Sequence, residues 1–136
     1  MENLALKIRL AVLWLFVAVT MTAIVGTVLM VPGVIDEVRR EEIAGMQITH
    51  ELLLVMAITY FLGPLVMAVL SMTLKDSINR WANIIMGIVY TGYILIELIS
   101  NITTVAWPYA ILMDISAVVA AALIAWYAWK WPKQEA

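Results

Sequence analysis

The chain is short of charge and has no cysteine. Only 13% of its 136 residues are charged, whereas a soluble domain carries about 25%, and 65% are hydrophobic. This composition places the chain among membrane proteins. The absence of cysteine excludes a disulfide framework, a thiolate metal site and the redox pair that quinone-linked thiol oxidoreductases use.

Histidine and basic charge are scarce as well. A single histidine excludes a bis-histidine haem within one copy of the chain, so we expect no cofactor. One histidine among a few acids has no ligand spacing that specifies a metal ion, and we expect none. The net charge of −2 offers no basic surface, so we expect no nucleic-acid partner.

Four long apolar runs account for most of the sequence. They cover residues 8–31, 49–73, 79–100 and 107–131. A helix needs about 20 apolar residues to cross a bilayer core, and the first run exceeds the roughly 7–15 residues of a signal-peptide core. The sequence therefore predicts one all-α membrane domain over residues 1–136, a four-transmembrane-helix bundle whose first partner is the lipid bilayer.

A charged segment separates the first two runs. Pro32 and Gly33 end the first run, and residues 34–44 then place Asp36 in a first turn. Their apolar residues form one stripe, and Gly45 follows as a C-terminal stop. The pattern predicts a short amphipathic helix on the membrane surface, with a solvated loop as the alternative.

Signals inside the runs refine the helices. Thr49 is suited to cap the second helix, and Pro108 is suited to the first position of the fourth. Gly63 and Pro64 fall near the middle of the second run. Proline lacks a backbone donor and clashes with the preceding turn, so we expect a kink there.

The basic residues predict the orientation. Six of them fall on one side of the predicted spans and two on the other, which favours both termini in the cytoplasm. The six are Lys7, Arg9, Lys75, Arg80, Lys130 and Lys133, and the two are Arg39 and Arg40. Tryptophans cluster on the side with six basic residues. There Arg80 could lie over an indole ring as a cation–π contact, but an interfacial anchor is the simpler interpretation.

Two acids lie within the apolar runs. Glu97 is near the end of the third, and Asp114 lies seven residues past Trp107, about 10 Å along the fourth helix. A charge at the centre of a membrane helix costs about 2.5–3.5 kcal/mol on insertion scales, so both acids should face protein or a wet cavity. Asp114 shares its face with a ridge of small residues, Ala117, Ala121 and Ala125, suited to close packing within one chain or between copies in a homo-oligomer.

These acids anchor the predicted site. Tyrosines lie on the face of Glu97 and near the Gly-Pro kink, and the histidine lies at the outer start of the second helix. The candidate ligand-binding residues are Asp114, Glu97, Tyr93, Tyr90, Tyr60 and His50. The same residues also suit a structural role, in which the acids hold helices in register through hydrogen bonds and the rings pack against small residues.

Three segments carry a resemblance to a known family. They are NRWANIIMGI at residues 79–88, WYAWKWP at 126–132, and KIRL followed by LW within 7–14. The chain resembles an uncharacterised family of small prokaryotic four-helix membrane proteins. The resemblance implies a multi-pass protein of a prokaryotic plasma membrane and assigns no reaction.

Two hypotheses for function remain open. One is a binding or transport protein with an outward-facing acidic pocket for a small cation, a proton or a lipophilic ligand. The alternative is a structural or interaction subunit of a membrane assembly with no transported ligand. We do not expect an enzyme, because no nucleophile–base pair is present. Small multidrug exporters also have four helices and carry a glutamate in their first helix. This chain has no acid between Arg9 and Asp36, which argues against its being one of them.

Overall fold

The computed structural model describes residues 2–132. The elements are α1 (Glu2–Leu29), α2 (Val34–Arg39), β1 (Glu42–Ile43), β2 (Met46–Gln47), α3 (His50–Met56), the π-helix η1 (Ala57–Leu62), α4 (Gly63–Thr73), α5 (Asp76–Thr104) and α6 (Pro108–Trp129). Four helical stretches in this part of the chain are long and apolar enough to cross a membrane: 3–29, 50–73, 76–104 and 108–129. The mostly helical fold agrees with the prediction.

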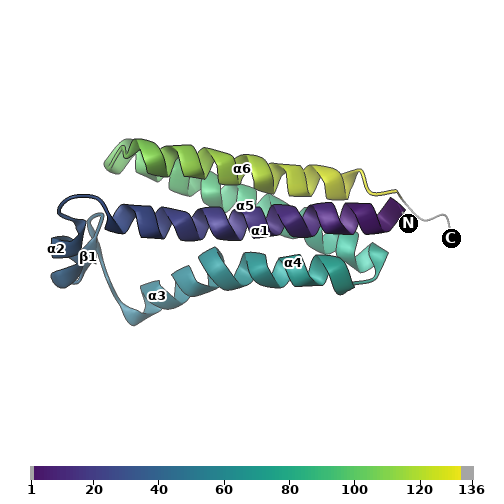
Figure 1. Cartoon of the computed structure of the whole chain (residues 1–136), viewed down its shortest axis with the longest axis horizontal. Helices are drawn as coiled ribbons and strands as arrows, with labels where there is room; N and C mark the ends of the chain where they lie inside the picture. The colour runs from purple at the N-terminus through teal and green to yellow at the C-terminus, as the bar shows by residue number, and fades with distance from the viewer. Residues whose placement is uncertain (1, 133–136) are drawn as a thin grey trace.

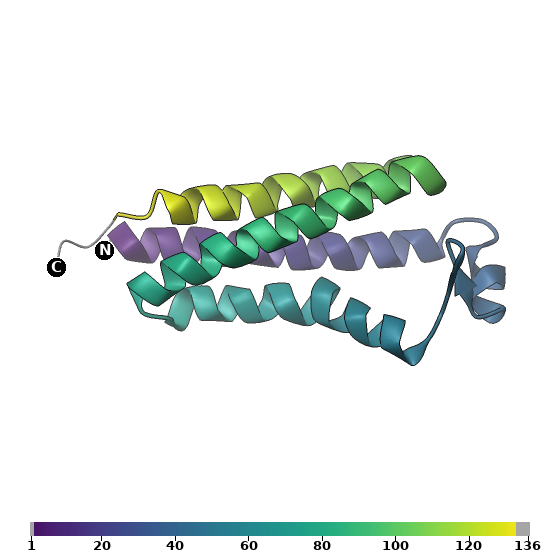
Figure 2. The same ribbon diagram turned by 180° about the vertical axis from the view of Figure 1, so that it is seen from behind.

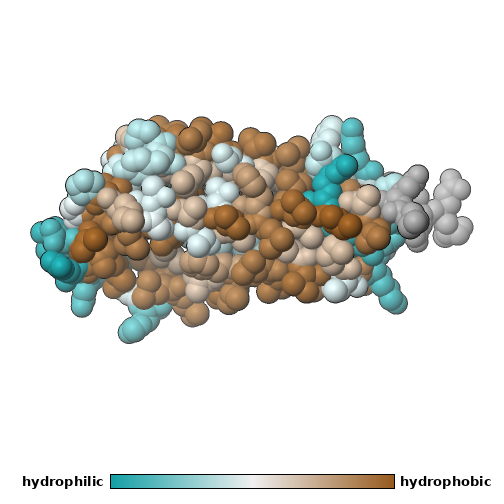
Figure 3. All heavy atoms as spheres, in the orientation of Figure 1, coloured by the Kyte–Doolittle hydropathy of each residue, from teal (hydrophilic) through white to brown (hydrophobic). Residues whose placement is uncertain are grey.

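The long helices lie side by side (Figure 1). α6 packs against both α1 and α5, and α1 also packs against α4. We call the end that holds the start of α1, the α4–α5 turn and the end of α6 the basic end. The opposite end, with α2, the β1–β2 hairpin and the α5–α6 link, is the hairpin end (Figures 1 and 2). On the face shown in Figure 3, hydrophobic residues cover the middle and hydrophilic residues gather at the two ends.

Small residues set the closest helix contact. Ala117 and Ala121 of α6 are fully buried, and Gly87 of α5 lies against Ala125 of α6. A Cβ atom on Gly87 would come within 2.9 Å of the Ala125 backbone nitrogen. The alanine ridge therefore packs within the chain, where it lets α5 and α6 approach closely.

The second span changes its winding at the predicted kink. Pro64 lies in the first turn of α4, and the π-helix η1 immediately precedes it. Pro64 has no N–H to donate to the turn before it, and the Tyr90 hydroxyl instead donates to the Thr59 carbonyl at 3.0 Å. Gly63 leaves room for this contact, because a Cβ there would collide with the Tyr90 hydroxyl. α3 consequently diverges from the line of α4 (Figures 1 and 2).

The prediction for residues 34–44 was wrong beyond Arg39. α2 ends there, and residues 42–47 form an antiparallel hairpin that pairs Glu42 with Gln47. The backbone adopts left-handed conformations at Glu41 (φ 62°), Ala44 (φ 49°) and Gly45 (φ 78°), which a helix does not allow. Gly45 thus turns the hairpin and does not terminate a helix.

Other helix ends differ by a few residues from the apolar runs. α1 starts at Glu2 and α5 at Asp76, because polar residues continue each helix beyond its apolar part. α5 also runs on to Thr104, so the link to α6 is shorter than predicted. The Thr49 hydroxyl accepts from the Leu52 N–H at 3.1 Å, which confirms the predicted cap of α3.

Candidate functional site

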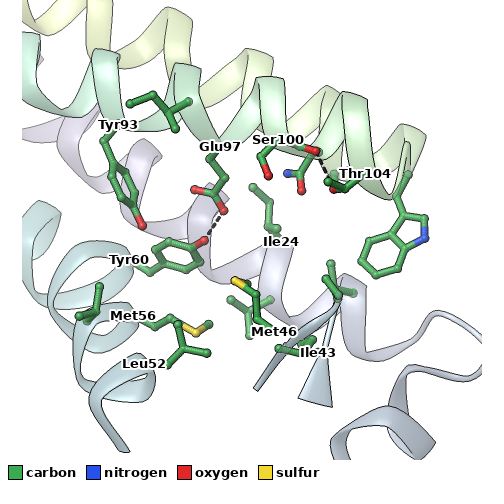
Figure 4. Close-up of a pocket in the computed structure, with 18 residues that line it drawn as sticks. Ile24, Ile43, Met46, Leu52, Met56, Tyr60, Tyr93, Glu97, Ser100 and Thr104 are labelled. Atoms are coloured by element: carbon green, nitrogen blue, oxygen red, sulfur yellow. Dashed lines mark hydrogen bonds between the residues drawn. The ribbon is translucent and has the colours of Figure 1, made fainter. Parts of the chain in front are cut away.

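A pocket of about 470 Å³ lies at the hairpin end. α1, the hairpin, α3, η1 and α5 form most of its walls (Figure 4), and Trp107 of the α5–α6 link and Ala110 of α6 complete the lining. Its lining residues are Ile24, Val25, Val28, Ile43, Ala44, Met46, Leu52, Val55, Met56, Tyr60, Tyr93, Ile96, Glu97, Ser100, Asn101, Thr104, Trp107 and Ala110. The walls from α1, the hairpin and α3 are entirely apolar.

The α5 wall carries a polar stripe. Ser100 and Asn101 lie three and four residues after Glu97, and Thr104 lies four and three residues after them, so the four share one helix face. Figure 4 shows Glu97, Ser100 and Thr104 succeeding one another along α5, opposite apolar side chains from the hairpin and α3. The pocket is thus polar on one side and apolar on the others.

Glu97 lies where this stripe meets η1. The Tyr60 hydroxyl donates a hydrogen bond to Glu97 Oε1 (Figure 4). The second carboxyl oxygen, Oε2, is buried and has no hydrogen-bond partner within residues 2–132. A buried acceptor without a donor costs about 1–3 kcal/mol, more if charged, so this oxygen is a ready acceptor for a donor that enters the pocket.

Asp114 lies behind the pocket wall. Its side chain is fully buried, and Asn101 donates to Oδ2 at 2.5 Å, while Oδ1 has no partner among the described residues. Asn101 lines the pocket and Asp114 does not. Of the two predicted acids, only Glu97 therefore lies on the pocket surface.

Of the remaining predicted site residues, one lines the pocket and two do not. Tyr93 lines the pocket, and its hydroxyl oxygen lies 3.5 Å from that of Thr59. Tyr90 does not line it: its hydroxyl is bound to the Thr59 carbonyl, and its ring packs edge-on against Trp14 at 5.3 Å. His50 is exposed at the start of α3 and is also outside the pocket lining. The structure thus gathers Glu97, Tyr60 and Tyr93 at the pocket and leaves Asp114, Tyr90 and His50 outside its surface.

A second polar cluster was not predicted. Ser71, Asn79 and Asn83 are fully buried between α1, α4 and α5. The Asn83 side-chain carbonyl accepts from Trp14 Nε1 at 2.7 Å and from Ser71 Oγ at 3.1 Å. Its amide donates to the carbonyl oxygen of Asn79 at 2.9 Å and to Asn79 Oδ1 at 2.7 Å. Every polar atom of the Asn83 side chain takes part in a hydrogen bond. We call the cluster of Ser71, Asn79, Asn83 and Trp14 the clamp, because its bonds join α1, α4 and α5.

The signal for this clamp lay in the spacing of the two asparagines. Asn79 and Asn83 are four residues apart and so share a helix face. The start of α5 at Asp76 places them in the second turn or deeper, facing α1 and α4.

Cations stack on aromatic rings at the basic end. The Arg80 guanidinium lies 5.1 Å from the Trp81 ring and 6.0 Å from the Trp129 ring, which is the less favoured of the two interpretations of this residue. Arg9 lies over Tyr127 at 4.8 Å, and Lys130 lies over Trp126 at 4.2 Å. Lys133, part of the same predicted group, is outside the described residues. Lys7 pairs with Asp76 at 3.0 Å, which ties α1 to the start of α5.

Comparison with known proteins identifies the family. A family model described as a family of unknown function (DUF6326) matches residues 3–136. The chain belongs to this family. The predicted resemblance to an uncharacterised family is thereby confirmed over nearly the whole sequence. No curated protein and no solved structure matches the DUF6326 chain. Among residues 2–132, no group of three or more His, Asp or Glu side chains is placed to hold a metal ion.

Proposed function

We propose that this DUF6326 chain is a multi-pass integral membrane protein that binds a lipophilic ligand in the pocket at the hairpin end. The role is binding or transport and not catalysis. The observation that carries the proposal is the pocket itself: a cavity of about 470 Å³ with apolar walls and one carboxyl group, Glu97. Small-molecule sites occupy about 300–1,000 Å³ and combine apolar walls with a few polar groups.

The proposed topology has four spans and places both termini in the cytoplasm of a prokaryote. It is supported by the four long apolar helices and by the basic residues at the end where α1 starts and α6 finishes. The hairpin end, and with it the pocket, then faces outward. The short α2 and the hairpin lie at the outer membrane surface.

Because the chain has no cysteine, single-cysteine variants test this topology directly. Glu42 in the hairpin and Lys75 in the α4–α5 turn are both exposed. In intact cells, a membrane-impermeant maleimide should label Glu42→Cys, and it should label Lys75→Cys only after permeabilisation. The reverse pattern would overturn the orientation, and labelling of both sites in intact cells would overturn the membrane crossing.

A pocket-filling variant tests ligand binding. Ser100 lines the pocket, whereas Thr103, on the same helix and equally exposed, does not. The probe is N-pentyl dansylamide, a neutral fluorophore whose emission rises in apolar surroundings. In nanodiscs of phosphatidylcholine it should bind the native protein saturably above the signal of empty discs. Ser100→Phe should remove this binding because the ring occupies the pocket, and Thr103→Phe should preserve it.

The outcome separates the two hypotheses for function. Equal binding by the native protein and by Ser100→Phe would place the probe elsewhere and contradict the proposed pocket. No saturable binding of any probe would favour the structural subunit, in which Glu97 and Asp114 serve only to hold helices together.

A further inference from the structure

The charge of the pocket points to the chemistry of its ligand. Glu97 is the only charged residue among the described residues that line it. Three of the neighbouring donors are already engaged: Tyr60 donates to Glu97 Oε1, Asn101 to Asp114, and Thr104 to the Ser100 carbonyl at 2.6 Å. Glu97 Oε2 is buried and has no hydrogen-bond partner among the described residues, so it is an unused acceptor for a donor that enters.

The depth of Glu97 limits the shape of that ligand. Its partner Tyr60 lies ten residues beyond His50, about 15 Å along the second span from the start of α3. Nearer the hairpin surface the α5 side of the pocket is polar but uncharged, at Ser100 and Thr104, and the hairpin side is apolar, at Ile43 and Met46. A phospholipid keeps its charged head at the interface and its apolar part deep, which is the reverse of this arrangement. A compact molecule that carries its charge into the apolar pocket fits it.

We propose that the pocket takes a compact organic ammonium ion, whose N–H group donates to Glu97 Oε2 while its apolar body contacts α1, α3 and the hairpin. This inference rests on the proposed function and names the class of ligand for the same pocket.

The mouth of the pocket indicates the route of entry. Val55 of α3 and Ile96 of α5 both line the pocket, yet they are 50% and 71% exposed, so they stand at its rim. α3 has no buried residue and diverges from the neighbouring helices (Figures 1 and 2). The pocket therefore opens between α3 and α5 onto an apolar surface at membrane depth, and the ligand enters from the outer leaflet. Inside the pocket, the polar stripe of α5 gives the ammonium group polar neighbours beside Glu97.

A matched pair of probes tests the ligand class. Dansylcadaverine differs from N-pentyl dansylamide only by a terminal ammonium group. In phosphatidylcholine nanodiscs the native protein should bind the cationic probe about 10- to 100-fold more tightly, because a charge-assisted hydrogen bond adds to the shared apolar contacts. Glu97→Gln should bring the two affinities together.

Glu51→Gln is the control, because Glu51 is exposed at the same end and does not line the pocket. This variant should keep the full preference for the cation. If both probes bind the native protein equally, and Ser100→Phe removes both, the pocket stands and the ammonium class is wrong. If the preference survives in Glu97→Gln, another group recognises the charge and the inference is equally wrong.

Nitroxide labels on single cysteines test the route. A label on Val55→Cys or Ile96→Cys should collide more often with oxygen, which concentrates in lipid, than with a water-soluble nickel complex. A label on Glu51→Cys, in the first turn of α3, should show the opposite preference. Nickel accessibility at Val55 equal to that at Glu51 would show that the mouth faces water and would overturn entry from the bilayer.

Discussion

Replacing Asn83 by alanine should destabilise the protein more than replacing an exposed apolar residue of the long helices. Asn83 is fully buried, and its side chain makes four hydrogen bonds, to Trp14, Ser71 and two atoms of Asn79. Side-chain hydrogen bonds inside membrane proteins contribute about 0.6 kcal/mol on average. Four such bonds give a loss of about 2.4 kcal/mol, or about a 50-fold fall in the ratio of folded to unfolded protein.

The measurement is the free energy of unfolding in bicelles, obtained by steric trapping. Ile85→Ala is the control, because Ile85 lies on the same helix and is 55% exposed. A double-mutant cycle of Asn83→Ala with Trp14→Phe should give a coupling energy of about 0.6–1.7 kcal/mol for the 2.7 Å bond between these residues. If Asn83→Ala unfolds like the native protein and the coupling is zero, the cluster does not clamp α1, α4 and α5 together.

Two further predictions use the same unfolding assay. Gly87→Ala should lower the free energy of unfolding by about 1–3 kcal/mol, because the added Cβ would meet the Ala125 backbone. Gly92→Ala is the control: no atom lies within 4 Å of its added Cβ, so the free energy of unfolding should stay unchanged or rise slightly. Equal effects of the two changes would contradict the close contact of α5 and α6. Asp114→Asn retains an acceptor for Asn101, so it should be more stable than Asp114→Leu by about 1–2 kcal/mol, and no difference between them would show that the 2.5 Å bond contributes nothing.

The sequence predicts the long helices well because their signals are local. Apolar runs of sufficient length locate four helices, Thr49 caps α3, and Pro108 opens α6. The Gly63–Pro64 step marks the place where the second span changes its winding. Each of these features depends on residues within one or two turns of one another.

What the sequence does not predict depends on contacts between distant elements. The hairpin forms where the charged residues suggested a helix. The sequence did not predict it because Glu41 and Ala44 adopt left-handed conformations, and neither residue type is typical of such a turn. The clamp joins Asn83 to Trp14, 69 residues away, and only the packed helices show that these side chains face each other. The pocket likewise needs the divergence of α3, so the sequence could nominate Glu97, Tyr60 and Tyr93 but could not separate them from Tyr90 and His50.

The π-helix has a consequence for insertions and deletions. A π turn accommodates one residue more than an α turn does. The second span therefore contains one residue more at η1 than an α-helix over the same turn would. Deleting one residue between Ala57 and Leu62 would let the segment wind as ordinary α-helix. The helix before it would then keep nearly the same face towards the cavity, because an α turn closes with one residue fewer than a π turn. Leu52 and Met56 would therefore still line the pocket, and the other three spans would keep their places. A natural chain shortened by one residue at this point would keep both the architecture and the pocket.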